Sequence, residues 1–439
     1  MLKLDQKTGR PVSIDGGYSQ GLPIRDTYVR IGDGMQYMHC LLYEPVAPVE
    51  ESSVGVIVIH SDDDYSMFPI GAELAKRGFR TLCGQVTRSG NTLDSKILDV
   101  GNAVRFMKNY GGIRRVVLMG HSGGATLMSA YQSIAENGAG IYQTEQNIIR
   151  CTVEEKLIPA DAVMLLDSNW GNGSMTLFSI DPAVTEEGNG TKLDPELDIF
   201  NPKNGFDPEG SHYSDEFIKR FCEAQAERNN RLLLKAQDRL HAIEKGMGNF
   251  ADDEPFVVAG GAQFAPCNKL IPQDTGLVSH TKEAHDLLHA DGTVTHEIIH
   301  CLRKPKFTES VTPIIASCLI GTVRDYLTNR AVPAGADYQI REDCVTGIEW
   351  NRTYNCTPGN IRFVHAPLLV MGMTGSYEYL AAEAVFANAA SEDKTLCFSE
   401  ASSHNFFLQE GIETVPGQYG DPAKAVFDKA AAWMRERMI

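Results

Sequence analysis

Apolar runs alternate with segments of helical periodicity along much of the chain. Apolar residues fill most positions of 54–60, 116–120, 162–167 and 367–372, and shorter extended runs cover 79–83 and 395–399. Such runs are typical of strands buried on both faces of a parallel sheet. Between them, apolar residues recur at helical spacing near 127–134, 95–110, 379–390 and 422–437. This alternation predicts an α/β fold with a doubly wound, mostly parallel sheet.

The alternation breaks between residues 168 and 362. This stretch is polar, is interrupted by Gly and Pro, and has helical periodicity only in patches, the longest at 213–245. It is too long for a loop, so we expect a large, mainly helical cap inserted between two core strands. The predicted domains are therefore a first core part at 1–167, the cap at 168–362 and a second core part at 363–439. The first 20 residues are polar and Gly-rich and are expected to form an arm.

Charge and cysteine usage narrow the classes of partner and compartment. The 439 residues contain 40 Lys and Arg against 57 Asp and Glu, a net charge of −17. An acidic balance argues against nucleic acid or an anionic membrane as a partner. The ten cysteines include no C-x-x-C pair, and several lie in apolar runs, as expected of reduced thiols in a cytoplasmic protein. We find no secretory leader and no stretch approaching about 18 apolar residues, so a soluble, cytoplasmic protein is predicted.

The apolar run at 116–120 ends in a small-residue turn that carries a candidate nucleophile. Gly120-His121-Ser122-Gly123-Gly124 fits the G-x-S-x-G template, with a strand before it and a helix after it. In such a nucleophile elbow the central serine is held in a strained turn at the N-terminus of the helix. Larger side chains at the flanking glycines would collide with the turn. Ser122 is therefore the candidate nucleophile.

The chain here resembles the α/β-hydrolase family. The residues that carry the resemblance are His60-Ser61 at a strand end, the elbow at Ser122, and Ala401-Ser402-Ser403-His404-Asn405-Phe406 after the closing strand. The stretch 198–206 also looks like a subgroup of microbial serine hydrolases with large caps. The resemblance implies the chain order Ser, acid, His. A serine hydroxyl needs a base within reach, and this order selects His404.

The acid of the implied catalytic triad is open between two residues. The usual family position follows the strand at 367–372, but residues 373–376 contain no carboxylate. Asp167 closes the strand after the elbow helix, a site that other α/β-hydrolases use, and we favour it. Glu378 lies a few residues beyond the usual position, and Glu383 is more remote. Asp167 could instead cap the segment that follows it.

An oxyanion hole needs two backbone N–H donors. Gly123 is expected to supply one, and Ser61 or Asp62 the other. His60 and His121 are interpreted as structural or pocket-lining residues. The run Asp62-Asp63-Asp64 is expected to point outward towards the N-terminus of the next helix, or else to repel anions or bind a cationic group.

Two further features bear on the site. Trp170 and Trp350, at the two ends of the insertion, are expected either to line the mouth of the pocket or to anchor the cap to the core.

His296-Glu297-Ile298-Ile299-His300 matches the zinc motif H-E-x-x-H. An extended lead-in and Pro305 argue against the helix that this motif needs, although His280, His285 or His289 could add a third ligand.

The sequence thus favours a serine esterase, a carboxylic ester hydrolase that cleaves a small organic molecule through an acyl-enzyme. No cofactor is expected, the partner is a small-molecule substrate, and a homodimer is possible. Carbon–carbon, lactone or amide hydrolysis would use the same site. Two rival hypotheses are a non-catalytic binding protein of the same fold and a zinc hydrolase that uses His296, Glu297 and His300.

Overall fold

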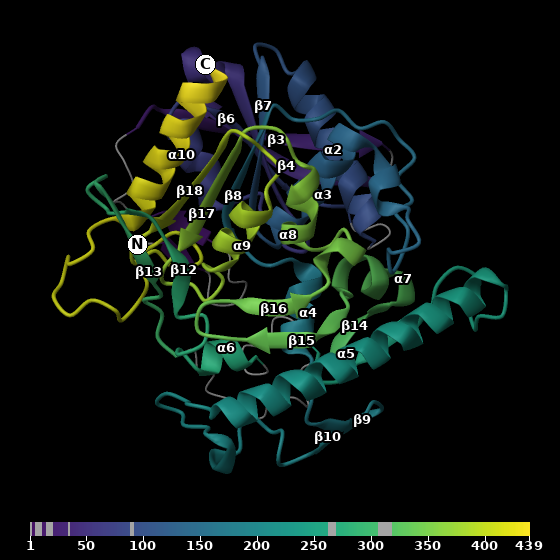
Figure 1. The fold of residues 1–439 in the computed structure, drawn as a ribbon. Coiled ribbons are helices and arrows are strands. Elements are labelled where there is room, and N and C mark those ends of the chain that lie inside the picture. The colour runs from purple at the N-terminus through teal and green to yellow at the C-terminus, as the bar shows by residue number, and fades with distance from the viewer. Residues whose placement is uncertain are drawn as a thin grey trace.

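The computed structural model describes residues 2–4, 11–14, 21–33, 36–87, 92–261, 269–305 and 318–439. Of the expected N-terminal arm, β1 (Leu2–Leu4) and β2 (Pro11–Ile14) form an antiparallel pair. Residues 1, 5–10 and 15–20 of that arm lie outside the described residues. Figure 1 shows a central twisted sheet with helices on both faces and a long helix at one side of the molecule.

A ten-stranded sheet forms the core, in the order β13-β12-β18-β17-β8-β7-β5-β6-β4-β3. The seven strands from β12 to β6 run parallel, and the antiparallel strands lie at the two ends. This arrangement confirms the predicted α/β class with a mostly parallel sheet. The strands are β3 (Ile24–Asp33), β4 (Gln36–Pro45), β5 (Val54–His60), β6 (Arg80–Gln85), β7 (Arg115–Ser122), β8 (Ala162–Ser168), β12 (His280–Leu288), β13 (Val294–His300), β17 (Leu368–Met373) and β18 (Lys394–Ser399).

Side chains of the central strands alternate between two apolar layers, which explains the continuous apolar runs. In β5, Val56 and Val58 pack with α1 (Pro69–Lys76) and α10 (Pro422–Met438). Ile57 and Ile59 face the opposite way and pack with α2 (Leu93–Asn109) and α3 (Gly123–Asn137). Helix α9 (Ala381–Asn388) packs on β17 and β8. Because both faces are covered, these strands need apolar residues at every position.

The strand order reverses at β5. The chain passes from β5 to β6 on one side, and later returns as β7 on the other side of β5. At such a switch point the loops after the two central strands diverge and leave room for a ligand. Here these are the loop after His60 and the turn at Ser122.

Most of the segment 168–362 lies outside the sheet. Its helices include α4 (Asn172–Ser179), α5 (Asp215–Glu244), α6 (Leu270–Gln273) and α8 (Thr357–Asn360). Its short strands are β9 (Val184–Glu186), β10 (Asn189–Leu193), β11 (Pro255–Val258), β14 (Leu319–Thr322), β15 (Ala334–Ile340) and β16 (Val345–Ile348). The β15–β16 hairpin and α4 separate α5 from the core sheet (Figure 1). Phe217 and Phe221 of α5 pack with Tyr338 of β15.

Two strands of the same segment join the main sheet. Strand β12 extends the sheet beyond β18, with Leu287 opposite Phe398 and Leu288 opposite Ser399, and β13 pairs with β12. The boundaries drawn at 168 and 362 therefore enclose part of the core sheet. These strands lack a fully apolar pattern because they lie towards the end of the sheet, where β12 is only partly buried and β13 is largely exposed. They cover the edge that β18 would otherwise leave open.

The cysteines of the described ranges form no disulfide. Nine of them are free thiols, and Cys267 lies outside those ranges. In the part of the chain that the structure describes, none of the helices combines the length and the apolar character needed to span a bilayer.

The packing of α5 can be tested on two residues of that helix. Phe221 is fully buried, whereas Leu234 is 60% exposed. Phe221→Ala is expected to destabilise the protein by about 3–5 kcal/mol because it leaves a cavity, while Leu234→Ala changes stability by less than about 0.5 kcal/mol. Urea unfolding followed by circular dichroism measures both. Equal effects of the two variants would show that α5 does not pack as described.

Candidate active site

The strand, turn and helix expected around Ser122 are present. Strand β7 ends at Ser122 and α3 begins at Gly123. Ser122 has φ 53° and ψ −128°, a strained conformation for a residue other than glycine. A Cβ atom on Gly120 would lie 2.5 Å from Cα of Ala125, and one on Gly124 would lie 2.9 Å from the carbonyl oxygen of Ile59. These two positions therefore require glycine, which is the physical basis of the motif.

Asp167 and His404 form a short hydrogen bond at the same edge of the sheet. Nδ1 of His404 lies 2.6 Å from Oδ2 of Asp167, whose side chain is fully buried at the end of β8. The other oxygen, Oδ1, accepts the Met373 N–H at 2.9 Å. A carboxylate at Nδ1 places the ring proton there, so Nε2 carries the lone pair that a general base needs.

Glu378 is a second carboxyl group beside the same histidine. Its Oε2 lies 3.7 Å from His404 Nδ1, beyond hydrogen-bond distance, and has no hydrogen-bond partner among the described residues. Burial raises the pKa of Glu378; the nearby His404 lowers this pKa and the Asp167 charge raises it further, with a net increase. Glu383, the more remote candidate, pairs with His285 at 2.8 Å. Of the three acids considered, Asp167 is the one in hydrogen-bond contact with His404.

His60 and His121 are buried and hold parts of the site in place. The backbone N–H groups of Asp62 and Asp63 donate to His60 Nδ1 at 3.1 and 3.0 Å, so the proton of this ring lies on Nε2. His121 Nε2 donates to the carbonyl oxygen of His404 at 2.6 Å, and its Nδ1 accepts from Tyr65 OH at 2.7 Å. Burial lowers the pKa of both histidines, which favours the neutral rings that these hydrogen bonds require.

The loop after β5 and the start of α4 converge on Gly123. A Cβ atom placed on Gly123 would lie 2.7 Å from Ser61 Oγ, 3.0 Å from Asn172 Oδ1 and 3.1 Å from His60 Nε2. Asn172 Nδ2 donates to Ser61 Oγ at 3.1 Å. Because the Asp62 N–H is engaged with His60, Ser61 is the better candidate for the second oxyanion donor. Asn172 was not singled out in the sequence, since nothing in its neighbours marks a residue whose partner is more than a hundred positions away.

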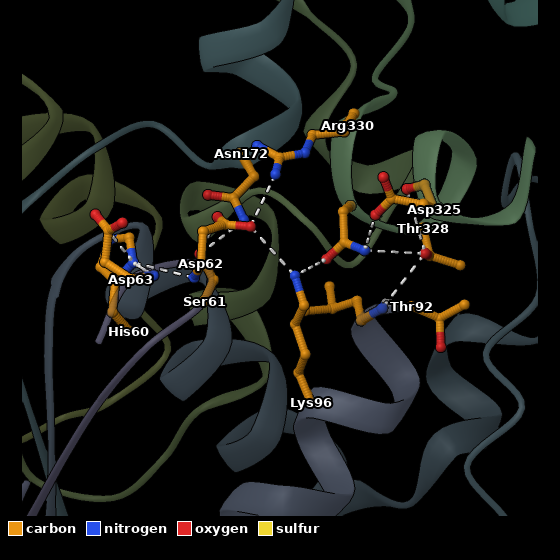
Figure 2. Close-up of polar contacts among 12 residues, drawn as sticks. His60, Ser61, Asp62, Asp63, Thr92, Lys96, Asn172, Asp325, Thr328 and Arg330 are labelled. Atoms are coloured by element: carbon orange, nitrogen blue, oxygen red, sulfur yellow. Dashed lines mark hydrogen bonds and ion pairs between the residues drawn. The ribbon is translucent and has the colours of Figure 1, made fainter. Parts of the chain in front are cut away.

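The run Asp62-Asp63-Asp64 does not point outward as a whole. Asp63 is exposed and Asp64 accepts the Ser66 N–H within its turn, but Asp62 is directed inward (Figure 2). Oδ1 of Asp62 lies 2.8 Å from Arg330 Nη2 and 3.3 Å from Lys96 Nζ. Burial alone would raise the pKa of Asp62, but Arg330 and Lys96 outweigh burial and hold this pKa well below its usual range. The outward expectation was wrong for Asp62 because two cations from distant segments meet it inside the protein.

The two tryptophans at the ends of the insertion favour the anchoring interpretation. Trp170 is buried in the apolar cluster of the inserted segment, with its ring against that of Phe178. Trp350 donates its indole N–H to Ser174 Oγ at 3.1 Å. The burial of Trp170 among apolar side chains of the insertion and the core therefore favours its role as an anchor.

The residues of the zinc motif lie on a strand and not on a helix. His296 and His300 belong to β13, where His296 is exposed and pairs with Asp286 at 2.9 Å. Across the described ranges, no three His, Cys, Asp or Glu side chains form a group that could hold a metal ion. The i, i+4 helical geometry that the motif needs is not formed.

The strand order, the elbow and the chain order of Ser122, Asp167 and His404 are those of the α/β-hydrolase fold. No family model matches the chain, and no curated protein matches it significantly. Several solved structures are similar at low identity. A hypothetical protein from Pseudomonas aeruginosa is 14% identical, with 100% of this chain and 99% of that chain covered and a TM-score of 0.44.

Two further solved structures are similar at the same level. Esterase B from Lactobacillus rhamnosis is 12% identical, with coverage of 95% and 90% and a TM-score of 0.40. Est1E from Butyrivibrio proteoclasticus is 11% identical, with coverage of 94% and 98% and a TM-score of 0.39. Similarity this distant assigns no activity and no substrate to the chain, so the chemistry has to be argued from the site itself.

The buried neutral histidines predict that acid destabilises the protein. Because the folded pKa values of His60 and His121 are lowered, the unfolded chain binds more protons below about pH 6.5, and stability falls as the pH falls through that range. Each histidine contributes a slope of at most about 1.4 kcal/mol per pH unit there. His121→Gln is expected to have a correspondingly shallower slope between pH 6.5 and pH 5. Urea unfolding at several pH values measures it, and an unchanged slope would contradict a neutral His121.

Proposed function

We propose that the protein is a serine hydrolase that cleaves an ester bond of a small organic molecule. The observation that carries the proposal is the 2.6 Å contact of Asp167 with His404 at the sheet edge where the strained Ser122 turn lies. The rings of His121, next to the nucleophile, and His404 are 4.5 Å apart. A nucleophile, a base and an orienting carboxylate are thus gathered at the switch point of the sheet.

In the proposed reaction, Ser122 Oγ attacks the acyl carbon while His404 Nε2 accepts the hydroxyl proton. The resulting oxyanion is stabilised by the backbone N–H groups of Gly123 and Ser61. The imidazolium then gives its proton to the departing alkoxide, and the acyl group stays on Ser122. Water, deprotonated by His404, attacks the acyl-enzyme; the bond from the acyl carbon to Ser122 Oγ breaks, the acid is released, and the imidazolium returns its proton to Ser122 Oγ. No cofactor enters any step.

Asp167 rather than Glu378 is assigned as the triad acid. Asp167 accepts the Met373 N–H and stands at hydrogen-bond distance from the ring, so it can both orient the imidazole and stabilise its positive charge. Glu378 is farther away, and burial favours its neutral form. Distance alone makes Glu378 the weaker partner of an imidazolium, because it makes no hydrogen bond to Nδ1.

The nucleophile is tested by Ser122→Ala. This variant is expected to lose ester hydrolysis by a factor of about 10⁴ or more, because the acyl-enzyme can no longer form, and to lose labelling by a fluorophosphonate probe. Hydrolysis of p-nitrophenyl esters of increasing chain length measures the first and mass spectrometry the second. Ser53→Ala, at the opposite end of the sheet before β5, is the matched control and should retain both.

Two outcomes would contradict this assignment. Full activity of Ser122→Ala would exclude the serine mechanism. A wild-type protein that neither hydrolyses the ester panel nor takes the probe would favour the non-catalytic binding protein, since the probe needs only an activated serine.

The acid is tested by Asp167→Asn and Glu378→Gln. Asp167→Asn is expected to lower kcat by about 10⁴-fold, because the amide no longer fixes the ring tautomer or the imidazolium charge. Glu378→Gln is expected to lower kcat by at most about tenfold, because Glu378 lies 3.7 Å from His404 Nδ1 and makes no hydrogen bond to the ring. Steady-state kinetics on the best ester of the panel compares them. The reverse order of the two effects would make Glu378 the triad acid.

A further inference from the structure

A short segment of the insertion touches the core at three consecutive residues. It consists of α7 (Val323–Asp325) and a π-helix (Tyr326–Arg330). Thr328 Oγ1 accepts the backbone N–H of Leu93 at 3.3 Å, and Asn329 Oδ1 accepts from Lys96 Nζ at 3.2 Å. Arg330 donates to Asp62 Oδ1 at 2.8 Å. Figure 2 shows these contacts as one continuous network that runs from the insertion to the loop after β5.

Asp62 connects this network to the proposed oxyanion donor. While Oδ1 receives Arg330 and Lys96, Oδ2 accepts the Ser61 hydroxyl at 2.7 Å. The backbone N–H of Asp62 donates to the His60 ring. Asp62 therefore holds the Ser61 side chain through Oδ2, and it holds its own loop through Oδ1 and its backbone N–H. Ser61 is the residue that is proposed to offer its N–H to the oxyanion.

The cluster excludes most water. The side chains of Asp62, Arg330 and Lys96 are 15%, 12% and 8% exposed. Removing one member of a buried ion pair leaves the other uncompensated, and a flexible loop can relieve this by moving its charge towards solvent. Loss of Arg330 would leave Asp62 with the longer 3.3 Å contact to Lys96, and would thus loosen Asp62, and Ser61 with it.

The segment that carries Arg330 is itself held firmly. Tyr326 and Leu327 are buried in the apolar cluster beneath α5. Asn355 Nδ2 donates to the carbonyl oxygens of Thr328 and Ala331, at 3.1 and 3.0 Å. π-Helical turns are rare and occur frequently at functional sites. Here the turn presents Asn329 and Arg330 together to the core, on a support that packing makes rigid.

We propose that Arg330 is a positioning residue of the hydrolytic site, which acts through Asp62 to hold the loop after β5 so that the Ser61 N–H faces the oxyanion. This rests on the proposed function. In this arrangement the insertion completes the catalytic site from outside the core sheet. A change in the docking of residues 323–330 would then alter the rate of the chemical step.

The test compares Arg330→Met, Arg330→Lys, Asp62→Asn and the double variant Arg330→Met/Asp62→Asn. Arg352→Met is the matched control, because Arg352 also lies in the insertion and forms an ion pair at 2.8 Å, but with Glu349 at the exposed surface. The readouts are kcat and KM for p-nitrophenyl butyrate, the rate of labelling of Ser122 by a fluorophosphonate, and hydrogen exchange of the peptide that covers residues 60–68.

Arg330→Met is expected to lower kcat and the labelling rate by about 100-fold, the effect of losing one oxyanion donor, with KM changed by less than about threefold. Arg330→Lys should have a kcat and a labelling rate at least about tenfold higher than those of Arg330→Met, because Lys keeps the positive charge. The double variant should be no slower than the slower single variant, since the two residues act through one another. Arg352→Met should match the wild type.

Two kinetic results would overturn the proposal. A rise in KM with kcat unchanged would make Arg330 a substrate contact, and a double variant whose effects multiply would show that Arg330 does not act through Asp62. A wild type that shows neither turnover nor labelling would contradict the proposed function but would not test the contact of Arg330 with Asp62.

In that case hydrogen exchange decides whether this contact holds the loop. Faster exchange at 60–68 in Arg330→Met than in Arg352→Met supports the contact, and equal exchange overturns it.

Discussion

The hydrogen bond between Asp167 and His404 is the interaction on which the rest of the site depends. It joins residues 237 positions apart, so it forms only when β8, β17 and β18 lie side by side in register. Met373, at the end of β17, then donates to the same carboxylate, and His121 holds the backbone of His404. The proposed base is therefore fixed from two neighbouring strands, as preorganised catalysis would require.

The strain at Ser122 is supported by the same sheet. The turn survives because Gly120 and Gly124 allow the backbones of α3 and β5 to approach closely, and because the apolar layers on both faces of the sheet hold the strands in place. On the other side of the proposed nucleophile, Asp62 carries a negative charge next to a site that is proposed to stabilise an anion. The two cations beside Asp62 balance that charge, so the loop can remain close to the oxyanion without repelling it.

Much of the fold followed from the chain alone. Four central strands, β5, β7, β8 and β17, are buried on both faces. They are therefore apolar at nearly every position rather than at alternate positions, and the sequence shows them as continuous apolar runs. The elbow was visible for a similar reason, since its glycines are required by close contacts within a few residues. Strands β12 and β13 were missed because β12 is only partly buried and β13 is largely exposed, so their patterns resemble that of a loop. The inward direction of Asp62 was missed because its partners, Lys96 and Arg330, are 34 and 268 positions away.

The sequence by itself determined the class of fold and the position of the turn at Ser122, because these rest on local periodicity and local steric contacts; that His404 is the base stays a prediction, which rests on chain order. Only the tertiary structure decided which acid meets the histidine, that Trp170 is buried, and that the zinc motif lies on a strand. It also showed that the insertion reaches the loop after β5 through Arg330. These features depend on which segments, far apart in the chain, pack together in the interior, where water is excluded and a charged side chain needs a partner. Local sequence patterns do not show which distant segments will be in contact.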